Sequence, residues 1–419
     1  MEQNIRLELL EKVREIKEAD IIVGIPSFNN VRTIGHVVRA VQAGLTKYFP
    51  DQKSVIINSD GGSTDGTVEA VEKATIEDFN AILVKHRREP VLKIMTPYHG
   101  IPGKGSAFRV IFQIAEMLKA KACIVADSDL RSITPEWVEL LAKPVLSQDA
   151  DFVAPLYHRH KYDGTITNSI IYPLTRTLYG KQVRQPIGGD FGFSGKLAAY
   201  YLSKDVWETD VARYGIDIWM TTTAIANDFK VCQSFLGAKI HDAKDPGADL
   251  SAMLYQVVGA AFDLMGQYVD RWKPIAGSVP VPTYGFKYTV GLEPITVNID
   301  RMIERFQLGA KELINIWEEF LSREIIRHLR RTSSGSKSRF SFPDEIWVEI
   351  VYNFALAAHK GKINQKHLLK SLTPLYIGRT AAFVKDTGES DAQQVEDKIE
   401  ALCLLFEQKK PFLRDNWQM

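Results

Sequence analysis

The stretch IIVGIPSFNN at residues 21–30 decides the fold class, because an apolar run ends there in a polar turn and a helical pattern follows at residues 32–47. The same order of run and turn recurs at SVIINSD (54–60), KIMTP (93–97) and ACIVAD (122–127). Strands that alternate with helices in this way predict a mostly parallel sheet with helices on both faces. In such sheets ligands bind beyond the carboxyl ends of the strands.

Working outward, the chain divides into three expected parts. Residues 1–19 have the spacing of an amphipathic helix, residues 20–265 carry the α/β pattern, and residues 266–419 are dominated by helical periodicity. The polar stretch at 331–345 is the best linker candidate. We therefore expect an α/β domain with a helical C-terminal extension, which could act as a lid, a dimer interface or a packed support.

Composition describes an ordinary globular protein. The chain has 419 residues, with 52 Lys and Arg against 51 Asp and Glu, so no global field favours nucleic acid as a partner. No apolar run approaches the about 20 residues of a membrane span, and the N-terminus lacks a signal segment. Three widely separated cysteines without a CxxC pair predict buried thiols. We expect a cytoplasmic protein and leave a homodimer open.

The segment IVADSDL (124–130) carries the strongest chemical signal. Asp127 and Asp129 flank Ser128 directly after an apolar strand. Two carboxylates at this spacing can share one hard divalent cation whose other positions stay open for a substrate diphosphate. A helix cap or solvated turn before Pro135 is the competing interpretation. The position after a buried strand favours a metal site.

Two further turns favour a nucleotide. The small side chains and backbone N–H groups of PSFNN (26–30) could grip a nucleoside. In NSDGGSTDGT (58–67), Asp60 could accept hydrogen bonds from a base or ribose, and the glycines allow close backbone approach. Either turn taken singly could be a helix cap. Because both precede the DSD turn, we interpret the three together as a nucleotide site.

PSFNN, DGGSTDGT and DSD on successive strands resemble the nucleotide-diphospho-sugar glycosyltransferases of the GT-A fold. Five further segments are similar to the glucosyl-3-phosphoglycerate synthase and mannosylglycerate synthase-like group of retaining enzymes. They are IPGKGSA (101–107), DSDLRSITPEWV (127–138), PIGGDFGFSG (186–195), YGIDIWM (214–220) and LGAKIHD (236–242). The resemblance covers roughly residues 20–265. It implies a hexosyltransferase that uses Mg²⁺ or Mn²⁺.

The resemblance also implies site residues, position by position. Contacts to the nucleotide sugar fall on Pro26, Ser27, Phe28, Asn30, Asp60, Gly61, Lys104, Asp127, Ser128, Gly188 and Gly189. The metal would be bound by Asp129 and His241, assisted by Asp127. The acceptor would be bound by Thr165, Thr167, Asn168, Tyr214 and Lys239. For catalysis, Asp190 and Asp217 would orient hydroxyl groups, and Lys104 would neutralise the departing diphosphate.

Some positions depart from the group's pattern. Asn30 stands where the group commonly has a glutamate, and Gly61 where it has a serine, which leaves base selection open. Thr165 stands where the phosphoglycerate enzymes carry an arginine. Without that guanidinium, the site lacks the two parallel N–H donors that best suit a phosphate. An acceptor without a phosphate, such as glycerate, is therefore expected beside 3-phosphoglycerate.

The main hypothesis is transfer of glucose or mannose from a UDP- or GDP-sugar to a small hydroxy acid, with retention of anomeric configuration. One alternative is an inverting family-2-like enzyme with a lipid or polysaccharide acceptor and Asp190 or Asp217 as base. The absence of a membrane span and of a basic amphipathic helix argues against a lipid acceptor. A nucleotidyltransferase would need a GxGxR-like loop, which VGIPSFNN (23–30) does not contain. A non-catalytic sugar-nucleotide sensor is the remaining alternative.

Overall fold

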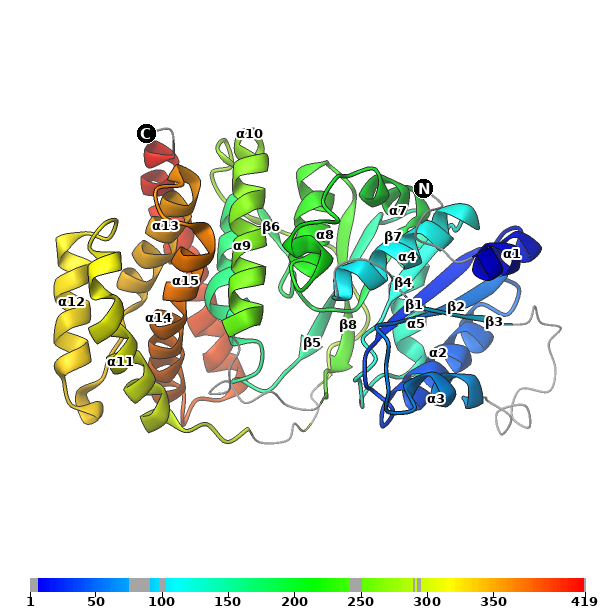
Figure 1. Cartoon of the computed structure of the whole chain (residues 1–419), viewed down its shortest axis with the longest axis horizontal. Helices are drawn as coiled ribbons and strands as arrows, with labels where there is room; N and C mark the ends of the chain where they lie inside the picture. Colours follow the sequence, from blue (N-terminus) through cyan, green and yellow to red (C-terminus); the bar gives the residue numbers. More distant parts are fainter. Residues whose placement is uncertain are drawn as a thin grey trace. The chain divides into compact units, whose positions relative to one another are not determined.

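Figure 1 shows the computed structural model of the chain, which describes residues 7–74, 91–97, 103–241, 251–288, 291 and 295–417. The described residues group into two compact units. The first takes its residues from 1–159, 183–242 and 281–292, and the second from 160–182, 243–280 and 293–419. Residues 160–182 and 251–265, which we expected in the α/β domain, pack in the second unit.

The first unit is built on one sheet whose strand order is β10-β8-β5-β7-β4-β1-β2-β3. The strands are β1 (Ile21–Ser27), β2 (Ser54–Asp60), β3 (Leu92–Pro97), β4 (Ala122–Val125), β5 (Phe152–His158), β7 (Phe191–Ser194), β8 (Val231–Ala238) and β10 (Thr283–Tyr284). All neighbours pair in parallel except β7, which is antiparallel to β4 and β5. The predicted mostly parallel α/β sheet is confirmed.

Helices cover both faces of this sheet (Figure 1). They are α1 (Leu7–Ile16), α2 (Ile34–Tyr48), α3 (Thr67–Lys73), α4 (Lys104–Met117), α5 (Pro135–Leu146), α7 (Gly195–Leu202) and α8 (Ile216–Ala226), with a 3₁₀ turn at Asp210–Ala212. Alternate residues of β1 face opposite sides. Val23 joins the core cluster formed with α2 and α5, whereas a Cβ at Gly24 would lie 2.5 Å from Ile111 of α4. The glycine thus lets α4 pack close to the central strand.

The second unit is mainly helical, as expected for the C-terminal region. Its helices are α6 (Tyr172–Tyr179), α9 (Ser251–Gln267), α10 (Val269–Trp272), α11 (Ile299–Trp317), α12 (Arg323–Ser334), α13 (Asp344–Lys360), α14 (Gln365–Asp386) and α15 (Ala392–Asn416), with a π-helical turn η3 (Thr167–Ile171) and a 3₁₀ turn η5 (Lys337–Arg339). The short strands β6 (Lys181–Gln182) and β9 (Val279–Pro280) pair in parallel. The guanidinium of Arg176 in α6 forms ion pairs with Glu400 and Glu407, which ties α6 to α15.

The linker expected at 331–345 is wrong. Helix α12 continues to Ser334, and the segment after it places Phe340 and Phe342 in the core, 4% and 2% exposed. Both rings contact Phe306 edge-on, with centroids 5.4 and 5.8 Å away. The polar composition concealed these two anchors, which fix the segment to α11.

Helix α12 is also the basic amphipathic helix that the sequence seemed to lack. Its apolar face is buried, and it consists of Ile325, Ile326 and Leu329. Its exposed face carries a stripe of arginines at helical spacing, namely Arg323, Arg327, Arg330 and Arg331. The expected absence of a basic amphipathic helix is therefore wrong, and it does not count against a lipid acceptor.

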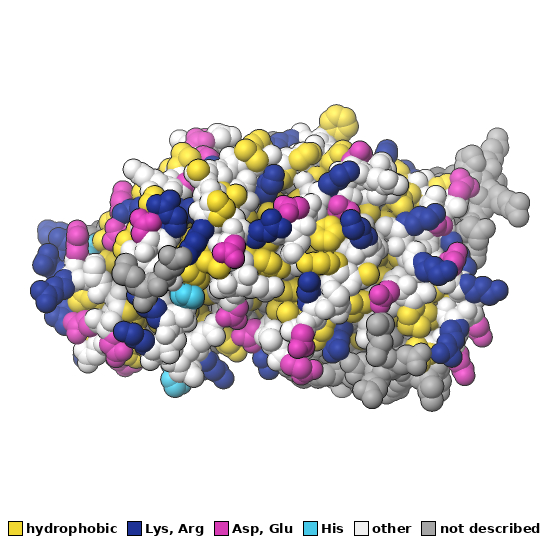
Figure 2. All heavy atoms as spheres, turned by 90° about the horizontal axis from the view of Figure 1, so that it is seen from above, with side chains coloured by type: hydrophobic (Ala, Val, Ile, Leu, Met, Phe, Trp, Pro, Cys, Tyr) yellow, Lys and Arg dark blue, Asp and Glu magenta, His cyan; other side chains and the backbone are white. Residues whose placement is uncertain are grey.

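Charges of both signs are interspersed over the face drawn in Figure 2, in keeping with the near-zero net charge. Within the described ranges, no helix combines the length and the apolar character that crossing a bilayer requires. Cys123, Cys232 and Cys403 are buried thiols, as expected.

Candidate active site

The predicted site residues of the first unit gather at the carboxyl ends of β1, β2 and β4. Parallel pairing aligns Ser27 with Asp60, and Gly24 with Val125. The DSD turn therefore follows β4 at the same edge at which β1 and β2 end. This is the edge where ligands of open α/β sheets bind.

Asp60 organises the turn after β2. Its carboxylate accepts hydrogen bonds from the backbone N–H groups of Gly62 (2.9 Å) and Ser63 (2.7 Å). It also accepts hydrogen bonds from the hydroxyl groups of Ser27 and Ser63, each at 2.7 Å. The N–H of Gly61 donates to the carbonyl of Ser27 at 2.8 Å. Asp60 thus joins the first two turns, and a contact to a base would have to share oxygens that are already engaged.

Asn30 links the first turn to the DSD turn. Its Oδ1 accepts from the N–H of Phe28 at 3.0 Å and from the hydroxyl of Ser128 at 2.8 Å. Thr33 Oγ1 donates to the carbonyl of Ser128 at 2.7 Å. Phe28 is 60% exposed, so its ring is accessible for stacking on a planar base.

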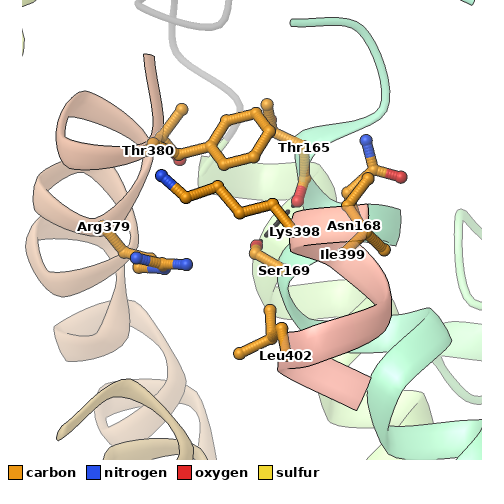
Figure 3. A pocket seen from close by; sticks show the side chains of 9 residues that line it. Thr165, Asn168, Ser169, Arg379, Thr380, Lys398, Ile399 and Leu402 are labelled. Carbon is orange, nitrogen blue, oxygen red and sulfur yellow. Dashed lines mark hydrogen bonds between the residues drawn. The ribbon is translucent and has the colours of Figure 1, made fainter. Parts of the chain in front are cut away.

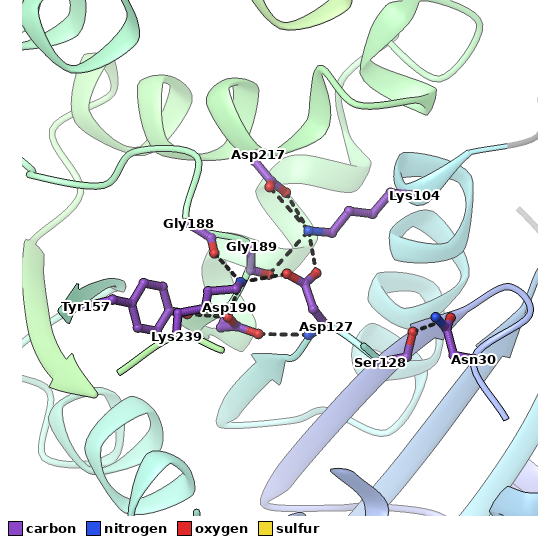
Figure 4. Close-up of polar contacts among 10 residues, drawn as sticks. All are labelled: Asn30, Lys104, Asp127, Ser128, Tyr157, Gly188, Gly189, Asp190, Asp217 and Lys239. Carbon is purple, nitrogen blue, oxygen red and sulfur yellow. Dashed lines mark hydrogen bonds and ion pairs between the residues drawn. The ribbon is translucent and has the colours of Figure 1, made fainter. Parts of the chain in front are cut away.

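Both carboxylate oxygens of Asp127 meet a lysine, as Figure 4 shows. Oδ1 lies 2.8 Å from Nζ of Lys104, and Oδ2 lies 2.8 Å from Nζ of Lys239. Burial alone would raise the pKa of Asp127, but the two lysines lower it well below its usual range. In this structure, Asp127 is the anion of an internal ion-pair cluster.

Lys104 joins the DSD turn to α8. It is the first residue of α4, and its Nζ lies 3.2 Å from the carboxylate of Asp217 in the first turn of α8. A cation at a helix N-terminus is unfavourable, and the surrounding carboxylates offset this. Burial would lower the pKa of Lys104, but Asp127 and Asp217 raise it. For Asp217, burial raises the pKa more than Lys104 lowers it.

Asp129 is brought near His241 by the backbone. Leu130 and His241 form an antiparallel bridge, and the N–H of Arg131 donates to the carbonyl of Ile240 at 2.9 Å. Burial raises the pKa of Asp129, and repulsion from Asp127 raises it further, while His241 opposes the shift. Among the described residues, no three His, Cys, Asp or Glu side chains lie close enough together to hold a metal.

Asp190 and Lys239 do not face solvent. Asp190 is 0% exposed, and its carboxylate accepts from the N–H of Asp127 at 2.8 Å and from the hydroxyl of Tyr157. Nζ of Lys239 lies 2.8 Å from three oxygens, one each of Asp127, Asp190 and Gly188. In these positions Asp190 does not reach a sugar, and Lys239 has no spare N–H for an acceptor carboxylate.

The expected acceptor residues are divided between the units. Tyr214 belongs to the first unit and is 45% exposed. Thr165, Thr167 and Asn168 belong to the second. Thr165 shares a hydrogen bond with the hydroxyl of Tyr376, and together with Asn168 it lines a pocket between η3, α14 and α15 (Figure 3).

Sequence reasoning missed one member of the cluster, Tyr157. It lies in β5 within FVAPLYH, where an aromatic residue next to apolar ones indicates only a core strand. No signal in the sequence could have found it, because its partner Asp190 lies 33 positions away.

The family model "Glycosyl transferase family 2" matches residues 22–205, which is less than half of the chain. None of the curated proteins compared with the chain matches it.

Among solved structures, the chain is similar to glucosyl-3-phosphoglycerate synthase from Mycobacterium tuberculosis. In its complex with Mn²⁺, UDP and phosphoglyceric acid, identity is 20%, the alignment covers 61% of this chain and 82% of that one, and the TM-score is 0.43. In its complex with Mg²⁺ and UDP, identity is again 20%, coverage is 61% and 83%, and the TM-score is 0.43.

The family match covers the stretch from β1 into the residues after α7, and this stretch contains Ser27, Asp60, Lys104, the DSD turn and Asp190. The family match and the parallel sheet agree with the resemblance seen in the sequence. Residues 22–205 are therefore similar to the family 2 glycosyltransferases, and within the described residues they contribute most strands of the mostly parallel sheet.

Proposed function

We propose that the protein transfers a hexose from a nucleoside diphosphate sugar to a small hydroxy acid and retains the anomeric configuration. The observation that carries the proposal is the cluster of Lys104, Asp127 and Asp217 at the carboxyl edge of the sheet, beside Asp129 and His241. A cluster with a cation, an exposed neighbouring aromatic ring and a DSD turn suits an anionic nucleotide.

A divalent cation fits the pair Asp129 and His241. A carboxylate and an imidazole are ligands that suit Mn²⁺ and related ions. Burial and the repulsion from Asp127 raise the pKa of Asp129, which is the condition that a nearby cation would relieve. When bound, the ion would supply positive charge to a departing diphosphate. We do not propose Asp127 as a metal ligand, because each of its carboxylate oxygens forms an ion pair with a lysine.

In the reaction, the bond between the anomeric carbon and the diphosphate oxygen breaks, and a bond to the acceptor oxygen forms. The acceptor proton passes to the diphosphate. Nζ of Lys104 contacts Asp127, Asp217 and the carbonyl of Gly189, so it would exchange one of these partners for that diphosphate. The exposed ring of Phe28 would stack on the base. Because Asp190 is 0% exposed, it is not placed as a covalent nucleophile, so retention would require attack by the acceptor from the leaving-group face.

The test is an assay of the purified protein with UDP- or GDP-glucose and UDP- or GDP-mannose, with glycerate or 3-phosphoglycerate, and with Mg²⁺ or Mn²⁺. Activity that EDTA removes and that Asp129→Asn abolishes would support the proposal. Asp205→Asn is the matched control, because Asp205 is an exposed carboxylate remote in sequence from the DSD turn. Full activity of Asp129→Asn would refute the metal role.

An inverting reaction is the second candidate, and one observation favours it. Burial raises the pKa of Asp217, which is how a carboxylate becomes a better general base near neutral pH. Proton NMR of the product separates the two candidates: retention shows the same anomeric configuration as the donor, and inversion the opposite one. Phospholipid and polysaccharide acceptors belong in the same assay.

A further inference from the structure

Three buried side chains meet behind the DSD turn and come from separate parts of the chain. Tyr157 lies in β5, Asp190 directly precedes β7, and Lys239 directly follows β8. Their exposed fractions are 5%, 0% and 7%. Figure 4 shows Asp190 and Lys239 in contact with Asp127, and Tyr157 in contact with Asp190.

The polar atoms of these three side chains form hydrogen bonds with one another and with Asp127 and Gly188. The three N–H bonds of the Lys239 ammonium meet three oxygens at 2.8 Å, and those oxygens belong to Asp127, Asp190 and Gly188. Asp190 Oδ1 accepts from the N–H of Asp127, while Oδ2 accepts from Lys239 and from the hydroxyl of Tyr157. Asp127 is therefore held at both its backbone and its carboxylate.

The loop before β7 is shaped around this arrangement. Gly189 has a φ of +91°, which L side chains rarely adopt. A Cβ at Gly189 would lie 2.2 Å from Oδ2 of Asp127 and 3.1 Å from Nζ of Lys239. The glycine thus allows the loop to pass directly over the ion pair, and a side chain there would displace it.

We infer that Tyr157, Asp190 and Lys239 form a clamp of positioning residues, rather than contacts to sugar or acceptor. The clamp fixes the DSD turn, keeps Asp127 as an internal counter-ion and so leaves Asp129 as the carboxylate that faces a cation. This inference rests on the proposed function for the role of Asp129. The clamp itself rests only on the contacts above.

Four variants separate a clamp from direct substrate contact. Tyr157→Phe removes one hydroxyl, and Asp190→Asn keeps an oxygen for the N–H of Asp127 but loses the charge that pairs with Lys239. Lys239→Met removes the cation, whereas Lys239→Arg retains a multidentate donor. Circular dichroism and thermal unfolding verify that each variant folds.

Binding of UDP or GDP in the presence of Mn²⁺, measured by calorimetry, is the first readout. A clamp predicts that Asp190→Asn and Lys239→Met weaken this binding about tenfold or more, as loss of an orienting partner does. Lys239→Arg should recover part of it, and kcat at saturating donor should change less than KM for the donor. An increase in KM for the acceptor alone, with nucleotide binding unchanged, would overturn the inference for Lys239. A loss of kcat alone would overturn it for Asp190.

Hydrogen exchange of the peptide that contains residues 122–130 is the second readout, and it requires no ligand. In Tyr157→Phe, the clamp predicts faster exchange in this peptide than in wild type, with exchange in β1 and β2 unchanged. Tyr200→Phe is the control, since Tyr200 donates to Asn227 elsewhere in the unit. Equal exchange in Tyr157→Phe and wild type would overturn the clamp. A wild-type protein that turns over no donor would defeat the proposed function and leave this readout intact.

Discussion

At the scale of residues, the two carboxylates of the DSD turn have the same chemistry and opposite surroundings. Asp127 lies between two lysines, and its pKa is lowered overall, whereas burial and Asp127 itself raise the pKa of Asp129. The sequence predicted the turn and its position after a strand. It could not separate the two roles, because Lys239 approaches from 112 positions away.

Neutralising these two residues should have opposite effects on the metal-free protein. Asp127→Asn leaves two buried ammonium groups short of a partner and should lower the free energy of unfolding by about 3–5 kcal/mol. Asp129→Asn removes a repelled carboxylate and should leave stability equal or higher, although it abolishes activity. Urea unfolding at pH 7 with EDTA measures both changes. Equal losses in the two variants would contradict the assigned surroundings.

A pH effect is expected from Lys410 in α15. Its ammonium donates to the carbonyls of Thr177, Trp272 and Ile275, and burial lowers its pKa to about 8 from 10.5. Between these two values the unfolded chain binds the proton and the folded protein does not, so the Lys410 contribution to stability rises with pH. The slope should approach about 1.4 kcal/mol per pH unit.

The measurement compares wild type with Lys410→Met by urea unfolding at pH 7.5, 8.5 and 9.5. Other groups titrate equally in both proteins, so the difference in unfolding free energy isolates Lys410. We expect the unfolding free energy of wild type minus that of Lys410→Met to increase as the pH rises. A difference that stays constant would show that burial does not shift this lysine.

At the scale of elements, the sequence predicted the parallel strands and their helices but not β7. The segment PIGGDFGFSG (186–195) contains four glycines, which do not indicate a strand, yet Phe191 and Phe193 are fully buried and pair with β4 and β5. A short antiparallel strand between two parallel ones depends on partners that are distant in the chain. Its glycines serve close packing, since a Cβ at Gly192 would lie 2.1 Å from the carbonyl of Leu141.

The same limit explains the helical region, where 298–330 reads as one periodic stretch but folds as α11 and α12. Ser322 caps α12, with its side chain accepting from the N–H of Ile325. Periodicity alone does not detect a break when the apolar positions continue on both sides. The segment after α12 was expected to be a linker because it is rich in serine, but the burial of Phe340 and Phe342 anchors it in the core.

Phe342→Ala tests that anchor. Removing a ring that is 2% exposed and packs against Phe306 and Trp347 should lower the unfolding free energy by about 3–5 kcal/mol. Ser336→Ala in the same segment is exposed and should change it by less than about 0.5 kcal/mol. Thermal or urea unfolding measures both. Similar small effects would mean that the segment is a linker after all.

At the scale of the whole molecule, near-zero net charge is compatible with an anionic substrate if the recognising charges are local. The candidate site offers Lys104 and a proposed place for one cation, and both signs mix over the face drawn in Figure 2. Long-range steering by surface charge is therefore expected to be weak, and screening should affect it little.

Ligand-induced stabilisation should reveal the donor base. At a concentration 100 times Kd, the correct nucleotide adds about 2.7 kcal/mol to the free energy of unfolding. Melting temperatures with UDP, GDP and ADP, each with and without Mn²⁺, should show one large shift that requires the ion. No shift with any of the three would count against a nucleotide site. A shift that persists in EDTA would count against the ion.

The order in which the chain enters the two units bears on synthesis at the ribosome. Strand β10, at Thr283–Tyr284, completes an edge of the sheet, and Arg176 of α6 finds Glu400 and Glu407 only in the last helix. The sheet is therefore complete only after residue 284 has been synthesised, and Arg176 of α6 gains both ion-pair partners only after residue 407. A fragment that stops at residue 265 would release both halves incomplete, with apolar surface open to chaperones.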